Sequence, residues 1–364
     1  DRSYRHEVVS SLEHKRAAGF DPRSAVAELV REAAFTHLNR LCAFKMLEER
    51  KVIREAVGRG TSSNGFKFYL AENPDDERNW LEGREDVAYR HFLRWLSATL
   101  DGEVGALFSR NDPAHRLFPP HRVLLEVLEL LNDPKLAGIW AEDETIGWVY
   151  QYFTPQELRK KAHKESQAPR NSYELAFRNQ FYTPRYVVRF LVDNTLGRIW
   201  YEMRGGRTKL VETCTYLVKP SGDACPAGCD KNPRRKKDPR DIRIIDPACG
   251  SGHFLLYCFD LLEVIYEEAY EDDETPAFSV TGRTLRQDYP DLDGFKRSVP
   301  ALILEHNLHG IDIDRRSVQI TAFALWMRAQ RAYQEMGLRK DDRPVIRRSN
   351  IVRAEPMPDY VGSP

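Results

Sequence analysis

The feature that most constrains the fold is a short apolar run that ends in an acid and leads into a glycine-rich turn. Ile242-Arg243-Ile244-Ile245 precedes Asp246, residues 247–252 read Pro-Ala-Cys-Gly-Ser-Gly, and 253–270 have the apolar spacing of a helix. Glycines let the backbone bend sharply and approach a ligand, and ligands of open α/β sheets bind where strands end. We therefore expect a buried strand, a tight turn and a helix, with a binding site at the turn.

The same alternation continues along the chain. Residues 300–307 predict a helix, 308–313 a buried strand and 315–336 a long amphipathic helix, while 185–196 predict a helix that begins just after Thr183-Pro184. Strands that alternate with helices are typical of a parallel sheet covered by helices. Asp246 and Asp312, the acids expected to end the two strands, are 66 positions apart. Because ~20 residues are usual in a compact unit, the acidic stretch 271–298 predicts an insertion outside the sheet.

The front of the chain has a different pattern, which predicts two domains. Residues 1–165 are expected to form a mostly helical N-terminal domain and 166–364 an α/β domain, joined by the polar stretch 156–171. Within the first domain, three segments have helical spacing and two are rich in turn residues. The predicted helices cover 24–49, 87–100 and 122–131, and the predicted loops cover 64–76 and 111–120.

An aromatic-dense segment, 139–153, precedes the expected domain boundary. It contains Trp140, Trp148, Tyr150, Tyr152 and Phe153. Aromatic side chains of this kind could stack on nucleic-acid bases. The more common use of such a stripe is packing, and we expect it to pack one domain against the next.

Composition and charge limit the class of protein. Hydrophobic residues make up 41% of the 364, which excludes a wholly disordered chain, and no apolar run approaches the ~18 residues of a membrane span. Lys+Arg and Asp+Glu are 55 each, so a polyanion would have to bind at local patches. Two groups of basic residues are candidate phosphate contacts, although each could also be solvated surface. They are Arg234–Lys237, for which solvated surface is the stronger interpretation, and the set Arg343, Arg347, Arg348 and Arg353, for which the two interpretations are about even.

Six cysteines are too few for a disulfide-stapled secreted fold, which favours a reduced, cytoplasmic protein. Cys214, Cys225 and Cys229 lie close enough in sequence to suggest a zinc site. A closed structural site needs four ligands, and no fourth is evident, so an incidental loop is the stronger interpretation. Cys249 is expected to be an inert small residue, and Asp314 to cap the helix after it.

The glycine turn excludes two nucleotide motifs and resembles a third. A dinucleotide fingerprint would need glycine at position 255, which is leucine, and a Walker A loop would need Gly-Lys-Ser/Thr. The string Asp-Pro-Ala-Cys-Gly-Ser-Gly over 246–252 resembles motif I of S-adenosylmethionine-dependent DNA adenine-N6 methyltransferases. Residues 179–184 (Asn-Gln-Phe-Tyr-Thr-Pro) look like motif X of that family, and 309–314 (His-Gly-Ile-Asp-Ile-Asp) look like motif II. The order X, I, II is that of the gamma type.

The resemblance extends over most of the chain. Residues 34–49, 144–153 and 343–356 look like the large adenine methyltransferases of BREX- and DISARM-type phage-defence systems. It implies a Rossmann-like class I methyltransferase sheet, S-adenosylmethionine as cofactor, and double-stranded DNA as substrate. Other defence-system proteins would be further partners.

The resemblance also implies a cofactor site. Thr183 and the glycine turn would hold the methionine end, Asp246 would face its ammonium, and Asp312 would accept both ribose hydroxyls. Phe181 and Ile313 would flank the adenine ring, Asn350 would hydrogen-bond it, and Ile351 would pack beside it. The full predicted set is Phe181, Tyr182, Thr183, Pro184, Asp246, Pro247, Ala248, Gly250, Ser251, Gly252, His253, Phe254, Asp312, Ile313, Asn350 and Ile351. His253 is expected to pack rather than to carry protons.

One family motif is missing. Amino-methyltransferases carry an Asn/Asp/Ser-Pro-Pro-aromatic motif on a fourth strand, and the only Pro-Pro pair here, Pro119-Pro120, follows Phe118. No catalytic residue is therefore assigned. Without a fourth strand the first strand would have an open edge, so we expect this chain to be part of a longer polypeptide or to need a partner segment. We expect a DNA adenine-N6 methyltransferase; the alternative is a catalytically incomplete cofactor-binding module of a defence complex, with protein or RNA methylation a weaker third interpretation.

Overall fold

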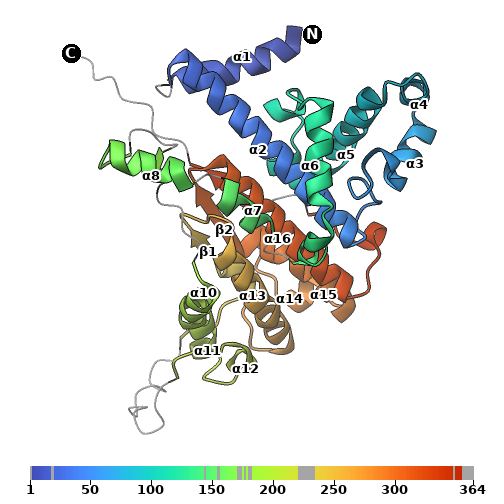
Figure 1. Cartoon of the computed structure of the whole chain (residues 1–364). Helices are drawn as coiled ribbons and strands as arrows, with labels where there is room; N and C mark the ends of the chain where they lie inside the picture. The colour runs from blue at the N-terminus through green and yellow to red at the C-terminus, as the bar shows by residue number, and fades with distance from the viewer. Residues whose placement is uncertain are drawn as a thin grey trace. The chain divides into compact units, whose positions relative to one another are not determined.

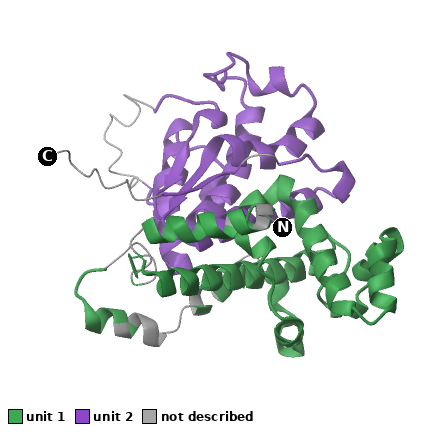
Figure 2. Cartoon of the chain, turned by 90° about the horizontal axis from the view of Figure 1, so that it is seen from above, with its two compact units in different colours: residues 1–179 green, residues 180–364 purple. Residues whose placement is uncertain are grey.

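The computed structural model describes residues 2–17, 20–142, 145–153, 156–169, 174–175, 178, 183–219, 234–346 and 349–354. The chain forms two compact units, which we call unit 1 (residues 1–179) and unit 2 (residues 180–364), shown in two colours in Figure 2. The boundary predicted from the sequence falls after residue 165, on the unit 1 side of this division. None of the helices in the described ranges is both long enough and apolar enough to cross a membrane.

Unit 1 is helical in all its described elements (Figure 1). Its longer helices are α1 (Arg2–Ala17), α2 (Pro22–Glu49), α3 (Asn64–Glu72), α4 (Pro74–Leu81), α5 (Glu85–Phe108), α6 (His121–Leu131), α7 (Thr145–Phe153) and α8 (Gln156–Glu165). The central helix α2 begins where Asp21 caps it, because the Asp21 carboxylate accepts the Arg23 and Ser24 N–H groups at 2.9 and 3.2 Å. It ends near Glu48, whose Oε2 accepts the N–H groups of residues 56–58.

One sequence-based expectation for unit 1 needs correction. The predicted loop 64–76 is wrong, since α3 and the start of α4 occupy it. Ser63, just before this stretch, caps α3, and Pro74 occupies the first turn of α4. In the aromatic segment 139–153, the rings of Tyr150 and Phe153 lie 5.5 and 4.6 Å from the ring of Phe35 on α2. The packing of this segment against the next domain stays a prediction.

The described residues of unit 2 contain a parallel sheet of three strands in the order β1-β2-β3: β1 (Ile244–Asp246), β2 (Leu308–Asp312) and β3 (Asn350–Arg353). Asp246 is in register with Gly310, and Gly310 with Ile351. The helices are α10 (Arg185–Val192), α11 (Arg198–Met203), α12 (Leu210–Thr213), α13 (His253–Glu271), α14 (Leu285–Asp288), α15 (Leu292–Leu302) and α16 (Arg315–Glu335). The predicted alternation of strands and helices in a parallel sheet is confirmed for these residues. The helix expected at 300–307 starts earlier, as α15, and continues as a π-helical turn over Ile303–Asn307.

Helices α13 and α16 pack against the sheet (Figure 1). Gly310, in the middle of β2, makes this packing possible. A Cβ at this position would lie 2.8 Å from Ile351 Cδ1, 3.1 Å from Leu255 Cδ1 and 3.2 Å from Cys249 Cβ. The glycine therefore lets α13 and the turn before it lie close against the strands.

We predict that Gly310→Ala lowers the unfolding free energy by about 1–3 kcal/mol, because the extra methyl overpacks a filled core. Urea unfolding followed by circular dichroism measures this change. The matched control is Gly102→Ala in α5, where a Cβ meets nothing within 4 Å. Equal midpoints for Gly310→Ala and the unsubstituted protein would contradict the account of this contact.

Candidate functional site

The predicted turn follows β1 directly and depends on two glycines. Gly250 and Gly252 have φ values of +55° and +82°, in the left-handed region that only glycine adopts at little cost. Asp246, the last residue of β1, accepts the Ala248 N–H at 3.1 Å and so starts the turn. Pro247 and Ala248 are exposed, whereas Ser251 and Gly252 are buried.

Asp312 joins the end of β2 to this turn. Its Oδ2 accepts the Gly250 N–H at 2.9 Å, and its Oδ1 accepts the Asp314 N–H at 2.8 Å. The two acids and the glycine turn, 66 residues apart in sequence at their extremes, therefore meet at the carboxyl edge of neighbouring strands. Each carboxylate oxygen keeps a second lone pair, so Asp312 can still accept hydroxyl groups from a ligand.

The pKa values of both carboxylates are raised above the ordinary value of an aspartate. Burial raises the pKa of Asp246. Burial also raises the pKa of Asp312, and the neighbouring charges of Asp314 and Asp246 raise it further. Two partly desolvated acids at one edge favour a cationic or hydroxyl-bearing ligand, because a cation offsets the repulsion between them and hydroxyl groups donate hydrogen bonds to them.

The start of α13 supplies backbone N–H donors, which suit a negatively charged group. Three turn amides are used internally: Gly250 N–H binds Asp312, Cys249 N–H donates to Ile311 O at 3.0 Å, and Gly252 N–H donates to Cys249 O at 2.7 Å. The helix itself begins at His253 after Gly252, which provides no side-chain cap. An anion would therefore find its donors in the first turn of α13, which holds half-buried His253 and Phe254.

Thr183 and Pro184 lie at the start of α10, which packs against α13. Thr183 is half-buried, and Pro184 is the residue before the first helical turn. Phe181 and Tyr182 lie outside the described residues. Thr183 therefore lies just before a helix that packs against α13, the helix that follows the glycine turn.

Asn350 and Ile351 are not brought to this edge. Asn350 begins β3 in register with His309, and its side-chain amide donates to Leu304 O and Glu305 O at 3.0 and 2.9 Å. Ile351 is buried against Gly310. The residues that β3 places beside Asp312 are Arg353, its register partner, and Ala354, whose N–H donates to Asp312 O at 2.8 Å. The direction of β3 explains this placement, because the start of a parallel strand lies at the opposite edge of the sheet from Asp246 and Asp312.

Asp314 and Cys249 have the structural roles expected of them. Asp314 caps α16, because its carboxylate accepts the Arg316 N–H at 2.9 Å. Ile313 is half-buried directly after β2. Cys249 is buried, and burial raises the pKa of its thiol to about 12, so it stays protonated.

The basic group at 234–237 is partly neutralised inside unit 2. Arg234 pairs with Glu202 at 3.0 Å, and Lys236 pairs with Asp272 at 2.8 Å and with Glu274 at 2.7 Å. This favours the solvated-surface interpretation over phosphate contacts for this group. In the second group, Arg343 donates to Leu338 O and Gln330 Oε1, Arg353 is exposed, and Arg347 and Arg348 lie outside the described residues.

Metal binding finds no support in the described part of the chain. Cys214 is buried, and burial together with its hydrogen bond to Asp193 raises the pKa of its thiol to about 12. Cys225 and Cys229 lie outside the described residues, and the described ones form no cluster that could hold a metal ion.

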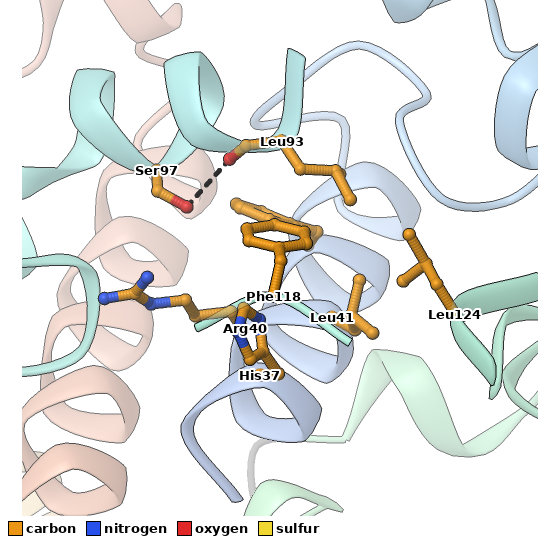
Figure 3. Close-up of a pocket in the computed structure, with 8 residues that line it drawn as sticks. His37, Arg40, Leu41, Leu93, Ser97, Phe118 and Leu124 are labelled. Carbon is orange, nitrogen blue, oxygen red and sulfur yellow. Dashed lines mark hydrogen bonds between the residues drawn. The ribbon is translucent and has the colours of Figure 1, made fainter. Parts of the chain in front are cut away.

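A small cavity in unit 1 contains none of the predicted site residues (Figure 3). Its walls are His37, Arg40, Leu41, Phe44, Leu93, Ser97, Phe118 and Leu124. Phe118, which precedes the Pro-Pro pair, packs edge-on against the ring of His37 at 4.5 Å. His37 Nε2 lies 2.8 Å from Leu117 O, and burial lowers the pKa of His37 to about 4. We interpret this cavity as a packing defect around a neutral histidine.

Comparison with known proteins places these features in a class. Residues 234–355, which include β1, the glycine turn, β2 and the described part of β3, match the family model of the DNA-methyltransferase domain of MmeI. The chain is 28% identical to the adenine-specific methyltransferase BrxX of Escherichia coli over 89% of its own length. It is 26% identical to the adenine-specific methyltransferase PglX of Lacticaseibacillus casei over 90% of its length. The predicted resemblance to large adenine-specific methyltransferases is thereby confirmed, and the chain spans 26% and 28% of the lengths of these two relatives.

The neutral His37 predicts how stability depends on pH. Its folded pKa of about 4 lies below the ordinary 6.5, so between these values the unfolded chain takes up a proton that the folded chain does not. Acidification from pH 6.5 to pH 4 should therefore destabilise the fold, with His37 contributing up to about 3 kcal/mol.

We expect His37→Gln to reduce the loss of unfolding free energy between pH 7 and pH 4.5, measured by urea unfolding at each pH. His6→Gln, at an exposed position on α1, serves as the control and should leave that loss unchanged. An identical pH dependence in all three proteins would show that His37 is not desolvated.

Proposed function

We propose that unit 2 is the S-adenosylmethionine-binding part of a DNA adenine-N6 methyltransferase. The observation that carries the proposal is the hydrogen bond from the Gly250 N–H to Asp312, 2.9 Å long, which joins the glycine turn to the acid at the end of β2. The matched methyltransferase family and the adenine-specific relatives support the same function. A Rossmann-like class I sheet remains part of this proposal.

The chemistry of the residues fits this cofactor. An ammonium group would find the Asp246 carboxylate, and a ribose diol would find the remaining lone pairs of Asp312. The methionine carboxylate would bind the first turn of α13, which has no side-chain cap, with Thr183, just before α10, as a further donor. Ile313 and Phe181 would contact the adenine ring. When bound, the cofactor would supply a methyl group on a sulfonium, ready for attack by an adenine amine.

DNA binding and the target amine need groups beyond this site. Arg353, exposed at the end of β3, is a proposed phosphate contact because it lies beside Asp312. The adenine would be flipped out of double-stranded DNA to reach the cofactor. We further propose that the protein works in a restriction or phage-defence system together with other proteins of that system, in the cytoplasm.

In the described part of unit 2, one edge of the sheet is unpaired, and side chains on one of its faces are exposed. Within the described chain, β1 pairs only with β2. Ile245 and Val352, on the face opposite α13, are 63% and 52% exposed. Because parallel sheets are normally covered on both faces, we propose that a further strand pairs with the open edge of β1 and that its helices cover the exposed face. This further segment would carry the group that binds the target amine.

A cofactor-binding module without catalysis is the second candidate function, favoured by the lack of an Asn/Asp/Ser-Pro-Pro-aromatic motif in this sequence.

Calorimetric titration with S-adenosylmethionine tests the proposal. We expect Asp246→Ala to weaken binding by about tenfold to a hundredfold, because a charge-assisted contact to the ammonium is lost. Asp241→Ala, whose carboxylate binds the Ser279 N–H in a loop instead, should bind like the unsubstituted protein. Equal affinities for all three proteins would refute the assignment of Asp246.

The raised pKa values predict the pH dependence of binding. Only ionised Asp246 attracts the ammonium, so affinity should fall on acidification, starting at a higher pH than for an ordinary aspartate. Asp312→Asn removes a neighbouring negative charge and should shift that fall to lower pH, whatever its effect on affinity at neutral pH. Titrations across pH 4 to 8 measure the shift, and a shift to higher pH would contradict the coupling between the two acids.

A further inference from the structure

We infer that Thr321, on α16, is a positioning residue that holds the glycine turn in the shape that binds the methionine end of the cofactor. The inference rests on the proposed function, and it assigns a role to a residue that lies outside the strand-end motifs. Thr321 is completely buried, so it would act through the turn and not by touching the cofactor.

Two parts of the Thr321 side chain contact the turn. Its Oγ1 donates to Gly250 O at 2.8 Å. Its methyl carbon, Cγ2, lies 2.8 Å from the position that a Cβ on Gly252 would take, so the methyl fills the space that glycine leaves. One side chain therefore lies against both glycines of the turn, Gly250 and Gly252.

These contacts fix Gly250 at both of its polar atoms. Its N–H is bound by Asp312 from β2, and its carbonyl is bound by Thr321 from α16. Glycine is the residue with the most backbone freedom to lose, and this turn contains two with positive φ. Restraint from both sides pre-organises the path into the first turn of α13, where the methionine carboxylate is proposed to bind.

A purely structural role makes a different prediction from a positioning role. If Thr321 only packed α16 against the turn, its replacement would change stability and affect all ligands of the site equally. If it positions the turn, the loss should depend on whether the ligand has an amino-acid tail. S-adenosylmethionine has this tail, and 5′-methylthioadenosine keeps the nucleoside but lacks it.

The experiment compares both ligands by calorimetry on three variants. Thr321→Val keeps the shape but loses the hydroxyl, and should weaken S-adenosylmethionine binding about tenfold while 5′-methylthioadenosine binding stays within about twofold. Thr321→Ser keeps the hydroxyl and should recover most of the lost affinity. Thr275→Val is the matched control, because the Thr275 hydroxyl also donates to a backbone carbonyl, Ala269 O, at 2.8 Å; both of its affinities should be unchanged.

Hydrogen exchange without ligand gives a readout independent of the cofactor. The backbone amides of 247–253 should exchange faster in Thr321→Val than in the unsubstituted protein or in Thr275→Val. Equal losses for both ligands, no loss for either, or unchanged exchange would overturn the inference. If the unsubstituted protein binds neither ligand, the proposed function fails, and faster exchange in Thr321→Val would still support Thr321 as the restraint on the turn.

Discussion

The contact between the Gly250 N–H and the Asp312 carboxylate is the interaction on which the site depends. It joins two segments that helices α13, α14 and α15 separate in sequence, and it sets the end of β2 against the turn that follows β1. The same carboxylate binds the Asp314 N–H and so also fixes the start of α16. A single acid therefore organises the turn and the following helix while keeping lone pairs for a ligand.

The proposed site therefore contains carboxylates on one side and backbone N–H donors on the other. Asp246 and Asp312 place two carboxylates at the strand ends, and burial raises the pKa of both. The uncapped start of α13 provides backbone donors on the other side. A zwitterionic amino acid attached to a nucleoside has groups that satisfy both, which is why the cofactor proposal follows from chemistry as well as from the relatives.

The sequence was sufficient to predict the elements that local patterns of residues determine. The strand, glycine turn and helix around Asp246, the strand ending at Asp312 and the cap at Asp314 were all predicted, because each depends on a few adjacent residues. Asn350 was assigned to the adenine by resemblance, yet its amide binds the π-helical turn before β2; strand register, a property of the whole sheet, decides this. Residues 64–76 were wrongly predicted as a loop. Asparagine, glycine and proline are common in turns, but they also occur at the starts of helices, as they do in α3 and α4. Thr321 was missed because its role depends on a contact 71 residues distant.

The most direct test of the account is a crystal structure of the protein with S-adenosylmethionine bound. We predict that the ribose hydroxyls bind Asp312, the ammonium faces Asp246 and the methionine carboxylate meets the first turn of α13, with the Gly250 N–H still bound to Asp312. Cofactor bound at another surface, or a carboxylate far from the start of α13, would contradict the central claim.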